Sequence, residues 1–121
     1  MHDLGFLFLP TWGRWYQLEG DPYARQVVIE AGQTLARRFQ EKGKYLCSFQ
    51  GAHSLYIDIM MNVPLVFEAA ELSQDERLFE IARQHCLTTR RYLVRGDFST
   101  AHEGIFDPES GMFLRYRTQQ G

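Results

Sequence analysis

The sequence has few cysteines, no long apolar run and no excess of charge of one sign. Its two cysteines, Cys47 and Cys86, lie far apart and lack C-x-x-C spacing, which favours reduced, partly buried thiols over a disulfide framework. No uninterrupted apolar stretch approaches the roughly 18 residues of a membrane span, so a membrane is not an expected partner. Met1-His2-Asp3 does not resemble the start of a signal peptide. We therefore expect a soluble, cytoplasmic chain without an export signal.

The charged residues nearly balance, with 13 Lys+Arg against 15 Asp+Glu and a net charge of -2. Such a chain has no basic field to attract nucleic acid, so nucleic acid is not an expected partner. The four histidines are scattered and include no His-x3-His pair, so no metal site is expected. A glycine-rich phosphate loop and a locally supported Ser-His-Asp triad are also missing. The motifs therefore predict no cofactor.

Apolar residues are plentiful enough for one modest domain. The chain has 121 residues, of which 45% are hydrophobic, and it is too short for two ordinary domains. Hydrophobic periodicity predicts the order helix, helix, loop, helix, helix, hairpin. The fold class is therefore mainly α, built from antiparallel helix pairs with a short C-terminal β-hairpin.

Two helices are predicted in the first third of the chain. The first covers Leu4 to Leu18, where Pro10 and Gly13 weaken the pattern. The second covers Asp21 to Phe39, because Asp21 can cap it, a proline follows at the first helical position and apolar residues recur at helical spacing. Residues 40 to 54 are predicted to form a long connection.

Two more helices and a hairpin are predicted after this connection. Asp58 to Leu72 has the composition of a helix in which Pro64 must cause a kink or mark the start of regular hydrogen bonding. Another helix is predicted from Ser73 to Gly96, because Ser73 begins a capping box and Gly96 can end the helix. The hairpin joins residues 105–106 to residues 112–116 through a turn at residues 107–111.

Asp58 is a lone acid in the apolar run SLYIDIMMNVPL. Burial of an isolated carboxylate costs several kcal/mol unless it is paired, hydrogen-bonded or kept protonated. A structural explanation is that Asp58 caps a helix N-terminus, which aspartate commonly does. The other explanation is catalysis, and the composition alone favours the cap.

Several longer motifs, taken together and in this order, carry a family resemblance. They are HDLGFLF at 2–8, IDIMMNVPL at 57–65, ARQHCLTT at 82–89, RGDFSTAHEGIFDPESG at 95–111 and TQQG at 118–121. This set resembles the unsaturated glucuronyl hydrolases of glycoside hydrolase family 88. The resemblance implies an (α/α)6 toroid of about a dozen helices. Residues 1–121 would then be an internal portion of that glycoside hydrolase domain, with flanking helices absent.

The resemblance also implies roles for individual residues. Asp58 is expected to be the general acid/base, and Asp3 its partner carboxylate. Three further residues, His2, His102 and Gln120, match positions that line the sugar pocket. Phe49 stands near where the family commonly has a tryptophan, and could stack on a sugar ring. Gln119 departs from the family's closing T-H-Q-G motif.

Each of these residues also has a structural alternative. His2 and Asp3 could belong to a frayed terminus, and His102 could be an ordinary loop histidine. Arg95 and Asp97 match a family motif that is expected to hold its loop in shape. His85 lies on the apolar face of its helix and is expected to be a core residue.

The implied reaction is removal of a Δ4,5-unsaturated uronic acid from the non-reducing end of lyase-generated, glycosaminoglycan-type oligosaccharides. It needs a proton delivered to C4 and a water directed at C5, so one carboxyl group can act first as acid and then as base. Two alternatives stay open. The chain could be a catalytically incomplete fragment that acts as a helical oligomerising or sugar-binding module through exposed helix faces. It could also be an unsaturated rhamnogalacturonyl hydrolase, although the R-x-D-x-S-x-x-H pattern at 95–102 favours the glucuronyl family.

Overall fold

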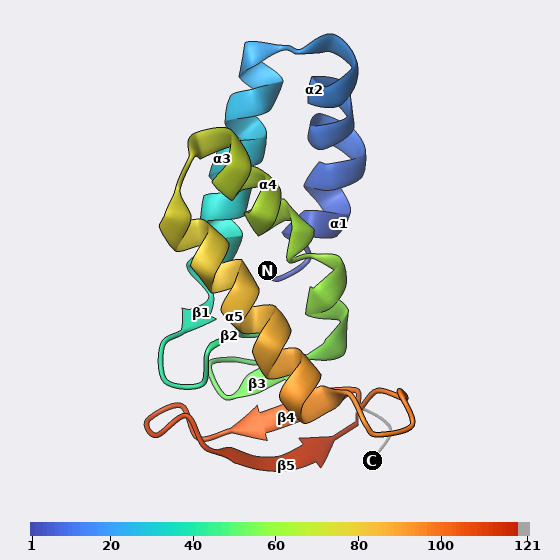
Figure 1. Ribbon diagram of the computed structural model, residues 1–121, viewed down its shortest axis with the longest axis vertical. Coiled ribbons are helices and arrows are strands. Elements are labelled where there is room, and N and C mark those ends of the chain that lie inside the picture. The colour runs from blue at the N-terminus through green and yellow to red at the C-terminus, as the bar shows by residue number, and fades with distance from the viewer. Residues whose placement is uncertain (119–121) are drawn as a thin grey trace.

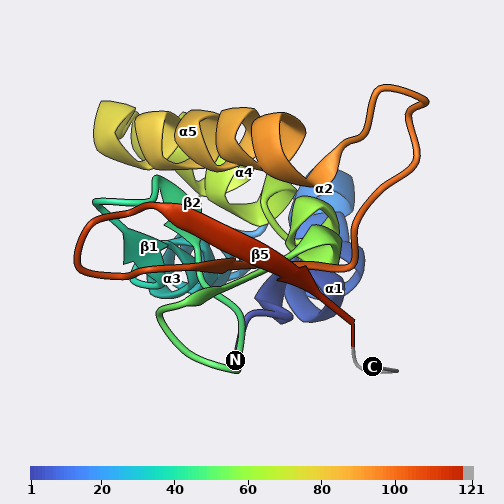
Figure 2. The same cartoon turned by 90° about the horizontal axis from the view of Figure 1, so that it is seen from below.

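The helices of the chain lie side by side and a three-stranded sheet closes one end, as the computed structural model shows for residues 1–118 (Figure 1). Successive helical segments run in alternating directions, so that α1 and α2 oppose α3, which opposes α4, which opposes α5. Seen from the sheet end, α5 lies along one side of the molecule and the sheet crosses the ends of the other helices (Figure 2). The predicted mainly α class is confirmed.

The first helical segment is continuous but changes its winding in the middle. α1 (Leu4–Phe8) leads into a π-helical segment, η1 (Leu9–Gly13), and then into α2 (Arg14–Glu19). The π turn contains the proline of this segment, which has no N–H to donate. Gly20 ends α2 in the left-handed conformation, with φ 64°. The predicted helix is confirmed, and its π turn was not predicted.

α3 (Pro22–Ala36) begins as predicted, because Asp21 Oδ1 accepts a hydrogen bond of 2.9 Å from the Ala24 N–H. Its predicted end at Phe39 is wrong. The chain instead forms β1 (Phe39–Gln40), which pairs antiparallel with β2 (Tyr45–Leu46). The predicted long connection over residues 40–54 therefore contains a short strand pair.

The next predicted helix is divided into two elements of different winding. η2 (Ile57–Met61) is a 3₁₀ helix, and α4 (Pro64–Ser73) starts at the proline. Proline at the first helical position explains where α4 begins, since its missing N–H would have no intrahelical partner there. Asp58 thus lies on η2 rather than at the start of a long α-helix.

The predicted cap of the last helix is wrong. α5 (Glu76–Leu93) is capped by Asp75, whose Oδ1 accepts from the N–H groups of Arg77 and Leu78, whereas the Ser73 hydroxyl donates back to a carbonyl within α4. The helix also ends before Gly96, because Val94 forms a β-bridge with Thr100.

The sheet has the order β3–β4–β5, with all neighbours antiparallel. β4 (Glu103–Phe106) and β5 (Phe113–Arg117) form the predicted hairpin, and Asp107 accepts two hydrogen bonds within its turn. β3 (Ser54–Tyr56), which was not predicted, pairs with β4 so that Tyr56 lies opposite Glu103. This pairing brings the start of η2 beside the start of β4.

One apolar core fills the space between α3, α4 and α5, and a smaller one lies under the sheet around Tyr45, Leu93 and Phe106. α3 and α4 approach closely at Gly32, where a Cβ atom would lie 2.3 Å from Ala69 Cβ. Both cysteines are free thiols, as predicted. Among the described residues, no helix combines the length and apolar character that a bilayer span requires.

His85 is a core residue, as predicted. Its side chain is fully buried and its Nδ1 accepts a hydrogen bond of 3.0 Å from the Leu46 N–H, while Nε2 has no partner among residues 1–118. Burial lowers the pKa of His85 from its ordinary 6.5 to about 3. The folded chain therefore holds His85 neutral at pH values where the unfolded chain protonates it.

We expect this difference to make the chain sensitive to acid. Between pH 6.5 and 3 the unfolded state binds one proton more than the folded state, so the free energy of unfolding falls as the pH is lowered. Between pH 7 and pH 5 the expected fall is about 2 kcal/mol. Urea unfolding at pH 7 and pH 5 measures this change. His85→Gln is expected to reduce it and His53→Gln to leave it intact; equal pH dependence in all three chains would contradict the assignment.

Candidate active site

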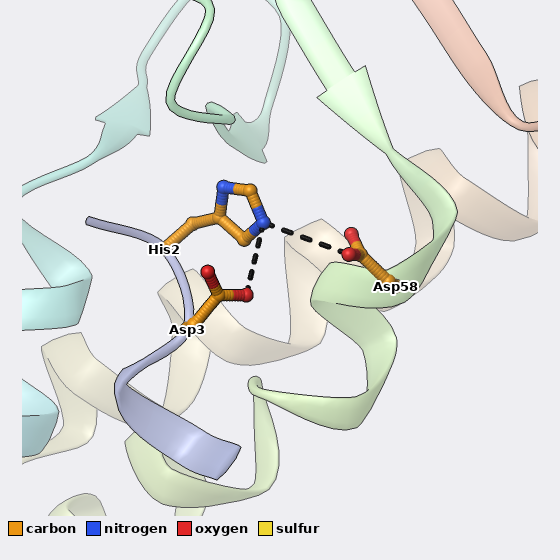
Figure 3. Close-up of side chains that lie close together, drawn as sticks. All are labelled: His2, Asp3 and Asp58. Atoms are coloured by element: carbon orange, nitrogen blue, oxygen red, sulfur yellow. Dashed lines mark ion pairs between the residues drawn. The ribbon is translucent and has the colours of Figure 1, made fainter. Parts of the chain in front are cut away.

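His2 lies between two carboxylates that come from opposite ends of the first half of the chain (Figure 3). Its Nε2 is 3.1 Å from Asp3 Oδ1 and 3.6 Å from Asp58 Oδ2. Asp3 precedes α1, and Asp58 lies on η2 directly after β3. The fold therefore brings together the two acids and the histidine that the sequence motifs singled out.

His2 is held in one orientation. The residue is 2% exposed, and its Nδ1 accepts a hydrogen bond of 3.0 Å from the Phe49 N–H. Because Nδ1 is the acceptor, the proton of the neutral imidazole lies on Nε2, which faces both carboxylates. A buried residue with fixed partners on both ring nitrogens contradicts the frayed-terminus alternative for His2 and Asp3.

Asp58 has one oxygen that nothing in the described part of the chain satisfies. Its Oδ1 is buried without a hydrogen-bond partner, while Oδ2 faces His2. The N-cap of η2 is Tyr56 and Asp58 lies inside its first turn, so the helix-cap explanation is wrong. Asp58 therefore directs one oxygen at His2 and keeps the other clear of any partner within residues 1–118.

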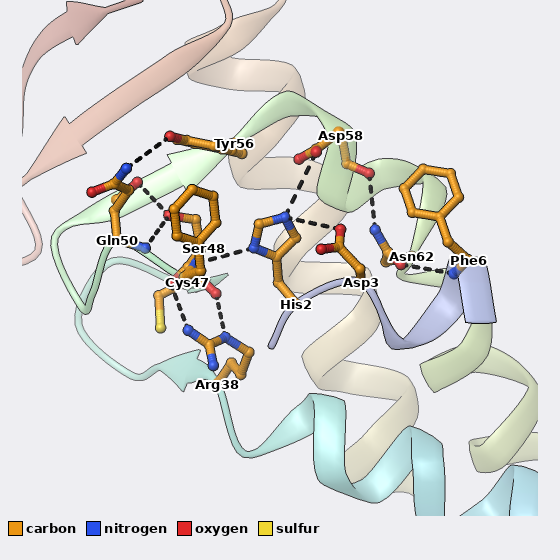
Figure 4. A network of polar contacts seen from close by, with 12 residues as sticks. His2, Asp3, Phe6, Arg38, Cys47, Ser48, Gln50, Tyr56, Asp58 and Asn62 are labelled. Carbon is orange, nitrogen blue, oxygen red and sulfur yellow. Dashed lines mark hydrogen bonds and ion pairs between the residues drawn. The ribbon is translucent and has the colours of Figure 1, made fainter. Parts of the chain in front are cut away.

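The two acid-bearing segments are joined by Gly5 and Asn62. A Cβ on Gly5 would lie 2.4 Å from Asn62 Cα, so only glycine permits this approach. The fully buried Asn62 accepts from the Phe6 N–H at 2.9 Å and donates to the Asp58 carbonyl at 3.3 Å (Figure 4). This contact places the start of α1 against η2 and therefore Asp3 near Asp58.

Aromatic rings extend the site toward the sheet. The exposed Phe49 ring stacks on His2 with centroids 5.5 Å apart, and it meets Tyr56 edge-on at the same separation. The exposed His102 ring also contacts Tyr56, with ring centroids 5.1 Å apart. A hollow lined by Gln50, Tyr56, Arg117 and Thr118 opens beside these rings. An apolar ring face next to polar groups is suited to a pyranose.

The remaining predicted residues have different positions. Gln120 lies outside the described residues. Arg95 and Asp97 shape their loop, since Arg95 donates to Ser99 Oγ and the Thr100 carbonyl while Asp97 accepts from Ser99, and these Ser99 hydrogen bonds lower the pKa of Asp97.

Sequence reasoning missed Asn62 and Tyr56 as parts of the site. Asn62 is a polar residue in the same apolar run as Asp58, and this was the available signal. It also missed that one nitrogen of His2 and one oxygen each of Asp3 and Asp58 lie within 4.8 Å of one another, a donor set that could hold a divalent ion. Local histidine spacing does not detect ligands that come from distant segments.

Curated proteins and solved structures that are similar to this chain carry the names of the same kind of hydrolase. No family model matches the chain. The unsaturated chondroitin disaccharide hydrolase of Streptococcus agalactiae serotype III (strain NEM316) is 36% identical over 125 residues, covering 99% of this chain and 31% of that protein. The chain thus spans about a third of the length of the curated relatives it matches.

Solved structures agree with this match. The crystal structure of unsaturated glucuronyl hydrolase from Streptococcus agalactiae has a TM-score of 0.93 and 36% identity, covering 99% of this chain and 32% of that one. Another, of an unsaturated glucuronyl hydrolase variant with dGlcA-Glc-Rha-Glc, has a TM-score of 0.93 and 32% identity over 99% of this chain and 33% of that one. The chain therefore corresponds in sequence and fold to a third of an unsaturated glucuronyl hydrolase, and the predicted resemblance to glycoside hydrolase family 88 is confirmed.

Proposed function

We propose that this chain carries the acid/base centre of a glycoside hydrolase that removes a Δ4,5-unsaturated uronic acid from the non-reducing end of lyase-generated oligosaccharides. The observation that carries the proposal is Asp58 Oδ1, which is buried beside His2 and Asp3 without a partner in the described part of the chain. The relatives' names, which specify unsaturated glucuronyl or chondroitin disaccharide hydrolases, support this substrate class.

Asp58 supplies the proton chemistry in the proposed mechanism. Its carboxyl group protonates C4 of the unsaturated ring, and the resulting carboxylate then takes a proton from the water that attacks C5. The hemiketal at C5 opens and releases the next sugar. Asp3, an oxygen of which lies within 4.8 Å of one from Asp58, is the partner carboxylate of this centre.

The aromatic cluster supplies binding. Phe49 and His102 are exposed and both contact the ring of the buried Tyr56, and Phe49 also stacks on His2. A sugar placed on these rings would have its unsaturated ring near Asp58. We therefore assign substrate contacts to Phe49, His102 and His2, and to Gln120 by resemblance.

We further propose that residues 1–121 are part of an (α/α)6 domain. Two observations support this: helices that alternate in direction, and a match to one third of much longer hydrolase chains. Apolar side chains are exposed on α1 and α5, among them Phe6, Leu7, Phe79 and Leu87. The self-association that such faces favour stays a prediction.

The proposed function is tested with a pair of substrates that differ only in the double bond. With an unsaturated chondroitin disaccharide, absorbance in the unsaturated uronate band is expected to fall and free hexosamine to appear. The saturated disaccharide should release nothing, because it has no vinyl ether to hydrate. An unchanged band with the unsaturated sugar, or release from the saturated one, would contradict the proposal; the former would favour the alternative of a non-catalytic helical module.

A further inference from the structure

Glu103 is a buried acid that the proposed chemistry does not use. It lies on β4 with no exposed surface, and its carboxylate accepts hydrogen bonds from Arg117 Nε at 2.7 Å and Arg117 Nη2 at 2.6 Å. A third hydrogen bond, of 2.5 Å, comes from the Ser54 hydroxyl on β3. Burial favours a higher pKa for Glu103, but the hydrogen bonds from Arg117 and Ser54 outweigh it and hold the pKa below its usual range. Glu103 is therefore ionised and can only accept.

The charge on Glu103 sets the direction of the hydrogen bonds that follow. Because Ser54 Oγ gives its proton to Glu103, it must act as acceptor in its 2.6 Å contact with Ser48 Oγ. The Ser48 hydroxyl therefore donates to Ser54, and its own lone pair accepts the Gln50 N–H at 3.1 Å. A neutral apolar residue at position 103 would leave both serine hydroxyls free to reverse.

This chain of hydrogen bonds ends at the turn that contacts His2. Arg38 holds the other side of the turn, since it donates to the carbonyls of Cys47 at 2.7 Å and Ser48 at 2.5 Å (Figure 4). Phe49 lies in the turn, and its N–H is the donor to Nδ1 of His2. The orientation of that N–H decides which nitrogen of the neutral imidazole carries the proton.

We propose that Glu103 is a positioning residue that acts through Ser54 and Ser48 to fix His2 in the tautomer whose Nε2–H faces Asp3 and Asp58. A buried ion pair is weak evidence for stability, since apolar residues of similar volume often do as well. A hydrogen-bonded partner that orients a functional histidine is a recurring use of such a group. The effect of this tautomer on turnover rests on the proposed function. The hydrogen bonds that fix the tautomer are independent of that function.

The test is a long-range ¹H–¹⁵N NMR spectrum of the histidine-labelled chain, in which His2→Gln identifies the His2 signals. The wild-type chain is expected to show Nδ1 unprotonated and Nε2 protonated. Ser54→Ala removes the relay but leaves the pair between Glu103 and Arg117 in place. We expect it to shift the His2 tautomer ratio by about fivefold, the worth of one net hydrogen bond, and Ser54→Thr to restore the wild-type spectrum.

The matched control is Ser110→Ala, which also removes one serine–carboxylate hydrogen bond, but in the hairpin turn. It should leave both His2 nitrogens unchanged. Ser48→Ala removes the relay one step nearer to His2 and gives the answer if Ser54→Ala does not fold. Wild-type His2 signals in either folded variant would overturn the proposal, and so would failure of both to fold, because the relay would then maintain the fold. A shifted tautomer in a chain that hydrates no substrate would leave the relay standing and count against the proposed function.

Discussion

Asp58→Asn is expected to lower kcat/KM on an unsaturated disaccharide by about 10²–10⁴-fold, the usual contribution of a general acid/base. The amide has nearly the shape of the carboxyl group but cannot donate a proton to C4 and then accept one from water. On the scale of transition-state free energy, the loss corresponds to about 3–5 kcal/mol. The initial rate of decrease in the unsaturated uronate absorbance measures it.

The same substitution is not expected to destabilise the chain. Asp58 Oδ1 is buried without a partner in the described part of the chain, and an oxygen of Asp58 lies within 4.8 Å of one from Asp3. Replacing one carboxylate with an amide removes the charge repulsion between the two acids and lowers the cost of burying the unpaired polar atom, because the amide is neutral. The urea midpoint of Asp58→Asn should therefore equal or exceed that of the wild-type chain.

Asp107→Asn is the matched control for this prediction. Asp107 is held in the hairpin turn by hydrogen bonds from Glu109 and Ser110, and asparagine is equally favoured in turns. Its activity should stay near the wild-type value. If both variants lost activity equally, or if Asp58→Asn kept it, Asp58 would not be the acid/base.

Local signals in the sequence predict a helix start correctly where a single capping residue determines it. Asp21 followed by a proline sets the start of α3, and the prediction is confirmed because the cap needs only the next turn of the chain. At the last helix, the capping box predicted at Ser73 does not form, and Asp75 caps the helix instead. The packing of α4 extends that helix through Ser73, so Asp75 becomes the cap. Competition between neighbouring elements is not visible in a local pattern.

The candidate site shows the same limit. Motif resemblance pointed to Asp3 and Asp58, and the structure places them together. The contact responsible joins the Phe6 N–H to Asn62 Oδ1 across 56 positions of sequence. Local periodicity does not report such a contact. The strand β3 was missed for a similar reason, since its partner β4 lies far along the chain.

Gly5→Ala is expected to damage both stability and activity, because Gly5 lies where the two acid-bearing segments meet. The added Cβ would lie 2.4 Å from Asn62 Cα and 2.6 Å from the Asn62 carbonyl oxygen, both backbone atoms of the segment that follows Asp58. Only movement of α1 away from η2 relieves this clash. Overpacking of this kind costs about 1–3 kcal/mol of unfolding free energy.

Movement of α1 away from η2 should also reduce turnover, because a displacement of about 1 Å between catalytic groups can lower the rate about 10²-fold. Gly96→Ala is the matched control, because a Cβ there meets no atom within 4 Å and Gly96 is not among the glycines with positive φ. Urea unfolding and the disaccharide assay should show losses in Gly5→Ala and none in Gly96→Ala. Wild-type activity in a folded Gly5→Ala chain would mean that the approach of α1 to η2 does not set the distance between Asp3 and Asp58 that the reaction needs.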